Sequence, residues 1–176
     1  SIDAEVIGWH RTPRLETPDE YRERIAALAA GEKTPARLFE LAELRYYAGD
    51  VEAARRAYAA CARHPDAGEL RPLARFWEGV CRARLLDCRA AVSAFEAAFS
   101  APDAELGAAA RLQAARCLFE RDDLYPLPRG TDRRRRAEEL AEQVWKQRAG
   151  ISPALACRAA ALLARKRDLR EKVIAA

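Results

Sequence analysis

The sequence contains no methionine and only two histidines, and glycine and proline contribute just 8 and 9 of its 176 residues. These low counts exclude a collagen-like chain or a flexible linker, and a hydrophobic fraction of 50% argues against intrinsic disorder. No apolar run approaches the roughly 18 residues that cross a bilayer, and the N-terminus lacks the charged-then-apolar pattern of a signal peptide. We therefore expect a folded chain without a transmembrane segment and, because it starts at Ser1, a fragment or a processed form.

Residue patterns typical of enzymes are missing as well. Neither His10 nor His64 has neighbours at metal-ligand spacing, and there is no glycine-rich phosphate loop, nucleophile elbow or zinc-protease helix. The five cysteines are scattered and never form the close pairs that zinc or redox motifs require; they are Cys61, Cys81, Cys88, Cys117 and Cys157. We expect buried thiols in a reducing, cytoplasmic compartment, and we predict no enzymatic activity, cofactor or metal.

Charge is nearly balanced, with 31 basic and 27 acidic residues and a formal charge of +4. A charge this small attracts nucleic acid only weakly, so we do not expect a nucleic-acid partner. Only 4 of the basic residues are lysine, which leaves 27 arginines. Such an arginine bias, together with many alanines, is what a GC-rich bacterial genome would encode.

Apolar residues recur at three- and four-residue steps almost throughout, while β-branched residues are scarce, so the sequence predicts an all-α fold. A proline precedes an aspartate by 15 positions three times, in the pairs Pro35 and Asp50, Pro72 and Asp87, and Pro153 and Asp168. Ala108 and Asp123 have the same spacing, and the triplet Pro-Asp-Ala at residues 65–67 returns 37 residues later at residues 102–104. Two independent markers thus indicate one period.

Each repeat has the features of a helical hairpin. Proline suits the first turn of a helix, and Thr34 and Ser152 are good caps directly before Pro35 and Pro153. Gly49 can end the first helix in a left-handed conformation, and Asp50 can cap the second helix. We expect helices from about residue 35 to 48 and from about 51 to 63, another at about 103–120, and a delayed partner capped by Asp132. Residues 124–131 contain two prolines and a glycine, and we do not expect them to be helical throughout.

The positions Leu38, Leu41, Ala42, Gly49, Asp50, Ala54, Tyr58, Cys61 and Pro65 resemble the tetratricopeptide-repeat (TPR) pattern. Its second-half signature returns at Gly79, Asp87, Ala91, Phe95, Ala98 and Pro102. The resemblance implies a right-handed superhelical solenoid of three to four antiparallel helix pairs. Spacings of 37 and 36 are longer than usual for the family, and Arg45 replaces a large apolar residue. Longer units are similar to those of bacterial envelope TPR proteins, which would imply a periplasmic or outer-membrane-associated location if an upstream signal was removed.

The expected organisation is a tail at residues 1–16, an N-terminal helix within residues 17–33, and a repeat domain at residues 34–176. Its units are expected at about residues 35–71, 72–107, 108–152 and 153–176, the last with a second helix starting near Asp168. Thr17 with Pro18 and Glu20 forms a capping-box pattern for the N-terminal helix. The tail lacks a helical period, and two interpretations stay open for it: an ordered or frayed tail, or a segment that lies against the solenoid or a partner.

In the TPR arrangement the first helix of each pair lines a concave surface, where a partner peptide or helix would bind. The resemblance places the following partner-binding residues on that surface: Phe39, Glu43, Tyr46, Tyr47, Phe76, Val80, Arg84, Leu112, Arg116 and Phe119. For the aromatic residues, packing between hairpins is the competing explanation, because one helical stripe serves both purposes. The first-turn positions that grip a peptide carboxylate in some TPR domains are Phe39 and Phe76 here, so any groove is more apolar than that type.

The strongest local charge is the run Arg133, Arg134, Arg135 and Arg136, in a region that has 13 basic and 6 acidic residues from Leu124 onward. It is either the solvated start of a helix or a basic patch for RNA or acidic lipid. The leading hypothesis is a non-catalytic protein–protein interaction scaffold with a protein or peptide partner. Alternatives are a structural or oligomerisation spacer of a larger protein, with self-association, and a binder of RNA or acidic lipid through the arginine run.

Overall fold

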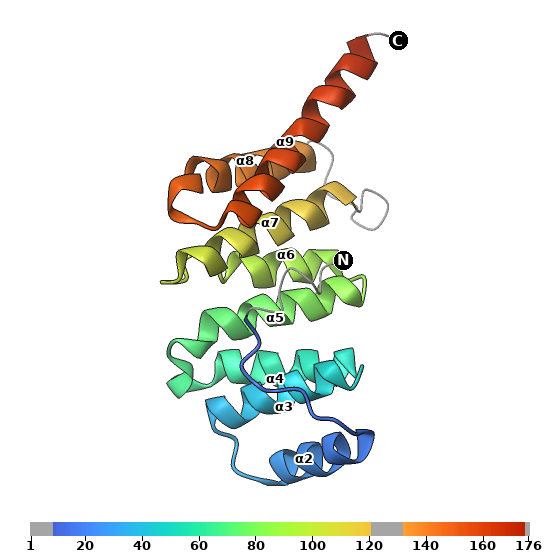
Figure 1. Cartoon of the computed structure of the whole chain (residues 1–176), viewed down its shortest axis with the longest axis vertical. Helices are drawn as coiled ribbons and strands as arrows, with labels where there is room; N and C mark the ends of the chain where they lie inside the picture. The colour runs from blue at the N-terminus through green and yellow to red at the C-terminus, as the bar shows by residue number, and fades with distance from the viewer. Residues whose placement is uncertain (1–8, 121–131, 175–176) are drawn as a thin grey trace. The chain divides into compact units, whose positions relative to one another are not determined.

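A computed structural model describes residues 9–120 and 132–174 of the chain. In the described part all regular structure is helical, which confirms the predicted all-α class. The chain divides into two compact units, Ser1–Leu85 and Leu86–Ala176. Each unit is built from helices that pack against the next helix along the chain (Figure 1). The predicted non-helical stretch at residues 124–131 lies outside the described residues.

The first unit contains α2 (Pro18–Ala30), α3 (Pro35–Tyr47), α4 (Val51–Arg63), a single 3-10 turn (Pro65–Ala67) and α5 (Leu70–Arg84). The predicted caps are present: the Thr34 hydroxyl accepts a hydrogen bond from the Arg37 N–H, and the Asp50 carboxylate accepts one from the Ala53 N–H at 3.0 Å. Gly49 has a φ of +85°, the left-handed conformation that lets the chain leave α3 and enter α4. Local sequence therefore sets both ends of this connection.

Aromatic rings dominate the core of the first unit. Trp77, Tyr58 and Phe76 are fully enclosed, and the Phe39 ring meets the Tyr58 ring edge-on with centroids 5.4 Å apart. Small residues on α4 such as Ala54 and Cys61 have no exposed surface, so neighbouring helices approach closely there. Ala54, Tyr58 and Cys61 are among the positions that resemble the TPR pattern.

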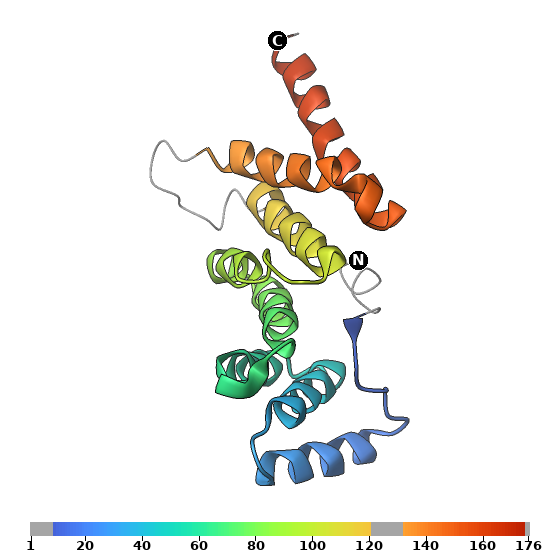
Figure 2. The same cartoon turned by 90° about the vertical axis from the view of Figure 1, so that its left-hand side faces the viewer.

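The second unit contains α6 (Cys88–Glu96), α7 (Ala104–Glu120), α8 (Arg133–Lys146), a 3-10 turn (Arg148–Gly150) and α9 (Pro153–Ile174). Asp87 caps α6 through the Ala90 N–H at 3.2 Å, and Asp132 caps α8 through the Arg135 N–H at 2.9 Å. Helix α7 packs against α6, α8 and α9, and the side chains it buries are mostly alanine. Figure 2 shows the consecutive helices of the unit from a second direction.

The expectation that a new helix begins near Asp168 is wrong. Helix α9 runs without interruption from Pro153 to Ile174 and passes straight through Asp168. At Asp50 a glycine in the left-handed conformation ends the preceding helix, whereas the residues before Asp168 are Arg165, Lys166 and Arg167, which favour helix. An aspartate alone therefore does not end a helix.

Helices α2 to α9 include no segment, among the residues described, with the length and apolar character that a membrane span needs.

Candidate functional site

A buried carboxylate lies where the chain before α2 crosses α3. Glu43 of α3 has no exposed surface. Its Oε1 accepts a hydrogen bond from the Arg11 N–H at 2.8 Å, and its Oε2 accepts one from the Thr12 N–H at 2.7 Å. His10 Nδ1 lies 3.1 Å from the same Oε1. Because a buried charge is costly unless hydrogen bonds compensate it, these three donors explain why a glutamate is tolerated here.

Rings surround this carboxylate on two helices. The His10 ring stacks on Trp77 of α5 with centroids 4.1 Å apart, and it also lies 4.8 Å from the Tyr47 ring and 5.8 Å from the Tyr46 ring of α3. Trp9 meets Phe76 of α5 edge-on at 5.6 Å. We call the surface formed by Glu43, Tyr46 and Tyr47 of α3 with Phe76 and Trp77 of α5 the aromatic face.

The chain that covers the aromatic face is the N-terminal segment, which we define as residues 9–16. Beyond His10, the Tyr47 hydroxyl donates to the Thr12 carbonyl at 3.0 Å, and the Arg14 guanidinium lies 5.0 Å from the centre of the Tyr47 ring. Nearer α2, the Leu15 N–H donates to the Tyr21 hydroxyl at 3.1 Å. In Figure 1 the segment is the dark-blue trace that crosses the helices of the first unit. Of the two interpretations of the tail, residues 9–16 follow the one in which it lies against the helices.

Burial changes the acidity of the tyrosines around Glu43. It raises the pKa of the Tyr47 hydroxyl well above its usual range, and the nearby Glu43 charge adds to that increase. The pKa of Tyr58 is raised by the same two causes in the same order. Both phenols therefore keep their protons at neutral pH, and that of Tyr47 is the hydrogen donated to the segment. Among the described residues, the buried Tyr58 hydroxyl and Trp77 indole N–H have no hydrogen-bond partner.

The predicted partner-binding residues of the first unit separate into two groups. Phe39 and Val80 are enclosed in the core, with 2% and 1% of their surface exposed. Glu43, Tyr46, Tyr47 and Phe76 belong to the aromatic face. Arg84 is exposed, donates to the Tyr46 hydroxyl at 2.7 Å and lies over the Tyr46 ring. The structure thus brings four of these seven residues together around the N-terminal segment, and Arg84 lies beside one of them, Tyr46.

In the second unit the predicted residues lie along α7. Leu112 is buried, whereas Arg116 and Phe119 are half-buried. The hydrogen bonds and ring contacts around Glu43 make the first unit the better-defined candidate surface.

The arginine run at the start of α8 is partly engaged in ion pairs. Arg135 Nε lies 3.0 Å from Glu139, and Arg136 pairs with Glu96 of α6. Both pairs are exposed, so each contributes little to stability, but each neutralises part of the positive charge. The run is therefore less electropositive than its sequence suggests.

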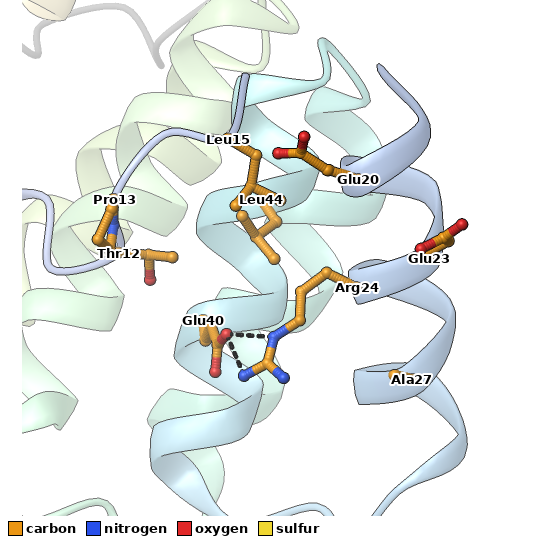
Figure 3. Close-up of a pocket in the computed structure, with 9 residues that line it drawn as sticks. All are labelled: Thr12, Pro13, Leu15, Glu20, Glu23, Arg24, Ala27, Glu40 and Leu44. Carbon is orange, nitrogen blue, oxygen red and sulfur yellow. Dashed lines mark hydrogen bonds and ion pairs between the residues drawn. The ribbon is translucent and has the colours of Figure 1, made fainter. Parts of the chain in front are cut away.

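A cleft of about 460 Å³ opens beside the N-terminal segment, between it and helices α2 and α3 (Figure 3). Thr12, Pro13 and Leu15 of the segment form one side of this cleft. The opposite side carries three carboxylates and one arginine, namely Glu20, Glu23, Glu40 and Arg24. Arg24 Nε donates to Glu40 at 2.7 Å, so the lining retains a net negative charge. We call it the acidic cleft.

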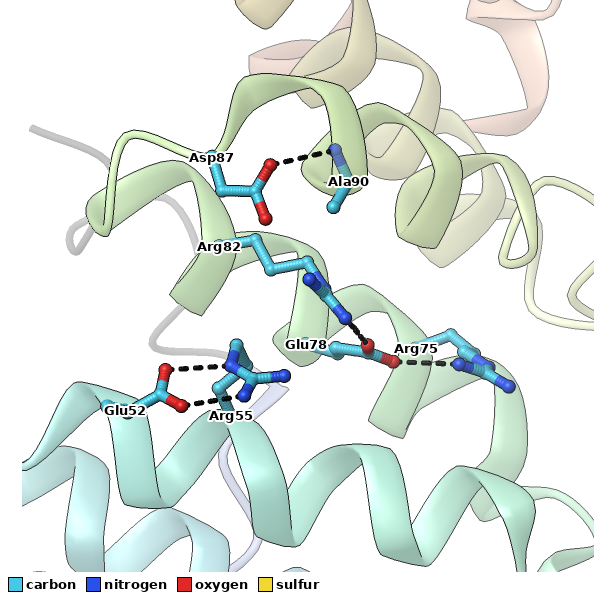
Figure 4. Close-up of polar contacts among 7 residues, drawn as sticks. All are labelled: Glu52, Arg55, Arg75, Glu78, Arg82, Asp87 and Ala90. Atoms are coloured by element: carbon cyan, nitrogen blue, oxygen red, sulfur yellow. Dashed lines mark hydrogen bonds and ion pairs between the residues drawn. The ribbon is translucent and has the colours of Figure 1, made fainter.

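A second set of ion pairs lies on α4 and α5 (Figure 4). Glu78, 3% exposed, accepts hydrogen bonds from Arg75 at 2.8 Å and from Arg82 at 2.9 and 3.0 Å. On α4, Arg55 binds Glu52 at 2.6 and 2.8 Å. Each carboxylate has its arginine partner on its own helix at three- or four-residue spacing, so this set supports the helices.

Sequence reasoning missed Trp9, His10 and Trp77 as members of the site. His10 was considered only as a metal ligand, and in the described part of the chain no group of three or more histidine, cysteine or acidic side chains is placed to hold a metal ion. One signal in the sequence could have identified Trp9. It is a large apolar side chain in a tail without a helical period, and such a side chain needs a surface to cover it.

Comparison of the chain with models of protein families, with curated proteins and with solved structures gives no match.

Proposed function

We propose that this chain is a non-catalytic protein–protein interaction scaffold that binds an extended segment or a helix of a partner protein on the aromatic face. The supporting observation is that this face already holds a stretch of non-helical polypeptide, from His10 to Arg14, together with the Trp9 ring that precedes it. Glu43 binds two successive backbone N–H groups, and rings from two helices enclose the side chains that flank them. Such backbone contacts with side-chain pockets are how peptide-binding surfaces obtain affinity and specificity.

The finer architecture belongs to this proposal. We infer a TPR-like arrangement of antiparallel helix pairs, in which α3 and α5 contribute the binding side of the first unit. Packing of each helix against its neighbour within a unit supports this inference, as do the caps at Asp50 and Asp87. Binding of RNA or acidic lipid by the arginine run has less support, because Arg135 and Arg136 are paired with carboxylates.

The test compares partner capture by three forms of the full chain. The face variant carries Tyr47→Ala and Arg84→Ala, and the control variant carries Arg56→Ala and Arg63→Ala on the exposed side of α4. Proteins captured from a bacterial extract are purified, and their affinity is measured by calorimetry. We expect the face variant to bind at least about 10-fold more weakly, as expected for loss of central contacts in an interface, and the control to match the unaltered chain.

Equal affinity in the face and control variants, with unchanged circular dichroism, would show that the aromatic face is not the binding surface. A third variant, Arg116→Ala with Phe119→Ala, asks whether α7 contributes. A chain that captures no partner and forms a defined oligomer in light scattering would instead support the spacer alternative.

A further inference from the structure

The aromatic face contacts both the main chain and the ring side chains of the segment that covers it. Glu43 contacts the main chain at Arg11 and Thr12, so any residue other than proline satisfies it at those two positions. Arg11 is itself exposed and contributes only its N–H there. Specificity comes from the two residues before, since Trp9 and His10 place rings against Phe76 and Trp77. The preferred ligand is therefore two ring side chains followed by two residues with free N–H groups.

The N-terminal segment leaves part of the neighbouring surface unused. It borders the acidic cleft with Pro13 and Leu15, neither of which carries a positive charge. Glu23, exposed on α2, has no ion pair recorded among the described residues. A segment with lysine or arginine at the position of Pro13 would add a favourable charge interaction that the chain's own segment lacks.

We propose that the aromatic face and the acidic cleft together recognise an extended basic segment of another protein, and that residues 9–16 occupy the face in cis until that segment replaces them. This inference rests on the proposed interaction function and adds the chemistry of the ligand and its internal competitor. A tethered segment competes at a high effective concentration, so a partner must offer contacts that the tethered segment does not make. The cleft supplies such contacts.

The first experiment measures binding of a fluorescein-labelled peptide with the sequence of residues 9–16 to full-length chains. The released chain carries Trp9→Ala and His10→Ala, which remove the ring contacts of the tethered segment but leave the face intact. A control variant, Arg56→Ala on the exposed side of α4, leaves both the N-terminal segment and the aromatic face unchanged. We expect the released chain to bind the peptide at least about 10-fold more tightly than the unaltered chain, and the control to behave as the unaltered chain.

The second experiment tests recognition of the main chain. N-methylation of the Thr12 amide in the peptide removes the hydrogen donated to Glu43 and should weaken binding to the released chain about 10-fold or more. N-methylation of the Arg14 amide, for which no hydrogen bond is recorded among the described residues, is the control. Equal losses for the two peptides would overturn the assigned role of Glu43.

The third experiment tests the charge of the ligand. A peptide with Pro13→Lys should bind the released chain about 3- to 5-fold more tightly at low salt, and the gain should shrink at high salt or with Glu23→Gln in the chain. An unchanged affinity would overturn the assignment of a basic partner.

Several outcomes would overturn the proposal as a whole. One is a folded released chain that binds no peptide; another is equal binding by the released and unaltered chains. If the double substitution prevents folding, the single variant Trp9→Ala replaces it in the experiment. Its affinity for the peptide should then lie between those of the unaltered chain and the released chain. A dimer of the unaltered chain that dissociates in the released chain would identify a second copy as the occupant and overturn the choice of another protein. A captured partner that binds the released and unaltered chains equally, but loses affinity with Tyr47→Ala and Arg84→Ala, would refute this inference while leaving the proposed interaction function in place.

Discussion

The two units of the chain bury different kinds of side chain. In the first unit the fully enclosed residues include Trp77, Tyr58 and Phe76, whereas in the described part of the second unit the one fully enclosed ring is Phe95 of α6, and α7 buries alanines and leucines. Wide rings hold helices apart and leave surface that another segment can cover, while alanine lets helices approach closely. Two of these rings, Phe76 and Trp77, are the ones that Trp9 and His10 of the N-terminal segment cover.

Each unit also has a glutamate that accepts a hydrogen bond from a distant backbone. Glu43 binds the N–H groups of Arg11 and Thr12, and half-buried Glu105 binds the Ser152 N–H just before α9. In the first unit the carboxylate holds a non-helical segment across a face, and in the second it fixes the start of a helix. A glutamate that accepts backbone hydrogen bonds therefore holds the N-terminal segment in the first unit and the start of α9 in the second.

The largest expected effect separates the stability of the two units. Trp77→Ala removes a fully enclosed ring that stacks on both His10 and Tyr58, so we expect a loss of about 3–5 kcal/mol in the free energy of unfolding. Phe95→Ala is the matched change in the second unit. Hydrogen exchange read by mass spectrometry should show faster exchange in α3–α5 for the first variant and in α6–α8 for the second. Equal acceleration in both units by either variant would mean that they unfold together.

A second comparison concerns the thiols of the two units. Burial raises the pKa of Cys81 to about 12 and that of Cys61 to about 11, whereas Cys157 of the second unit is exposed. The thiolate is the reactive form, so both buried groups stay protonated and unreactive at neutral pH. We expect iodoacetamide to modify Cys157 at least about 100-fold faster than Cys81, because modification of Cys81 requires local opening. Similar rates, measured by mass spectrometry, would show that the core between α4 and α5 opens readily.

Capping aspartates offer a matched pair of smaller changes. Asp50→Ala in the first unit and Asp87→Ala in the second each remove an acceptor for one helix N–H, at Ala53 and Ala90. We expect each to lower the free energy of unfolding by about 1 kcal/mol. The substitutions Asp50→Asn and Asp87→Asn are controls, since asparagine caps almost equally well. A loss as large for asparagine as for alanine would assign the effect to charge and not to the cap.

The smallest effect is expected at the arginine run. Arg136→Ala removes an exposed pair with Glu96 and should change the free energy of unfolding by less than about 0.5 kcal/mol in urea titrations. Arg134→Ala is the comparison within the run. A loss of several times this size for Arg136 would show that its pair with Glu96 helps to hold α6 and α8 together.

Local signals in the sequence predicted most helix boundaries. The start of α3 at Pro35, both ends of α4 at Val51 and Arg63, and the start of α8 after Asp132 agree with the structure. These positions depend on neighbouring residues, because a cap or a left-handed glycine acts within one turn. Asp168 shows the limit of such signals, since an aspartate without a helix-ending residue before it remains inside α9.

The sequence predicted only some of the residues of the candidate site, and the physical reason is that contacts between distant residues leave no local pattern. The resemblance to the TPR pattern placed Glu43, Tyr46, Tyr47 and Phe76 on the expected concave surface. It said nothing of Trp9 and His10, which lie more than 30 residues away from Glu43 in the sequence and have no period of their own. Nor did it show that Phe39 and Val80 are enclosed, because the neighbour that covers each side chain is set by helix packing.

By itself, then, the sequence determined the helical class, the capping residues and most helix boundaries. All of these follow from interactions within a few residues. The tertiary structure decided that a buried glutamate binds two backbone N–H groups of the N-terminal segment. That contact exists only where α3 and α5 bring their rings together around Glu43, since a carboxylate needs distant donors once burial has removed water.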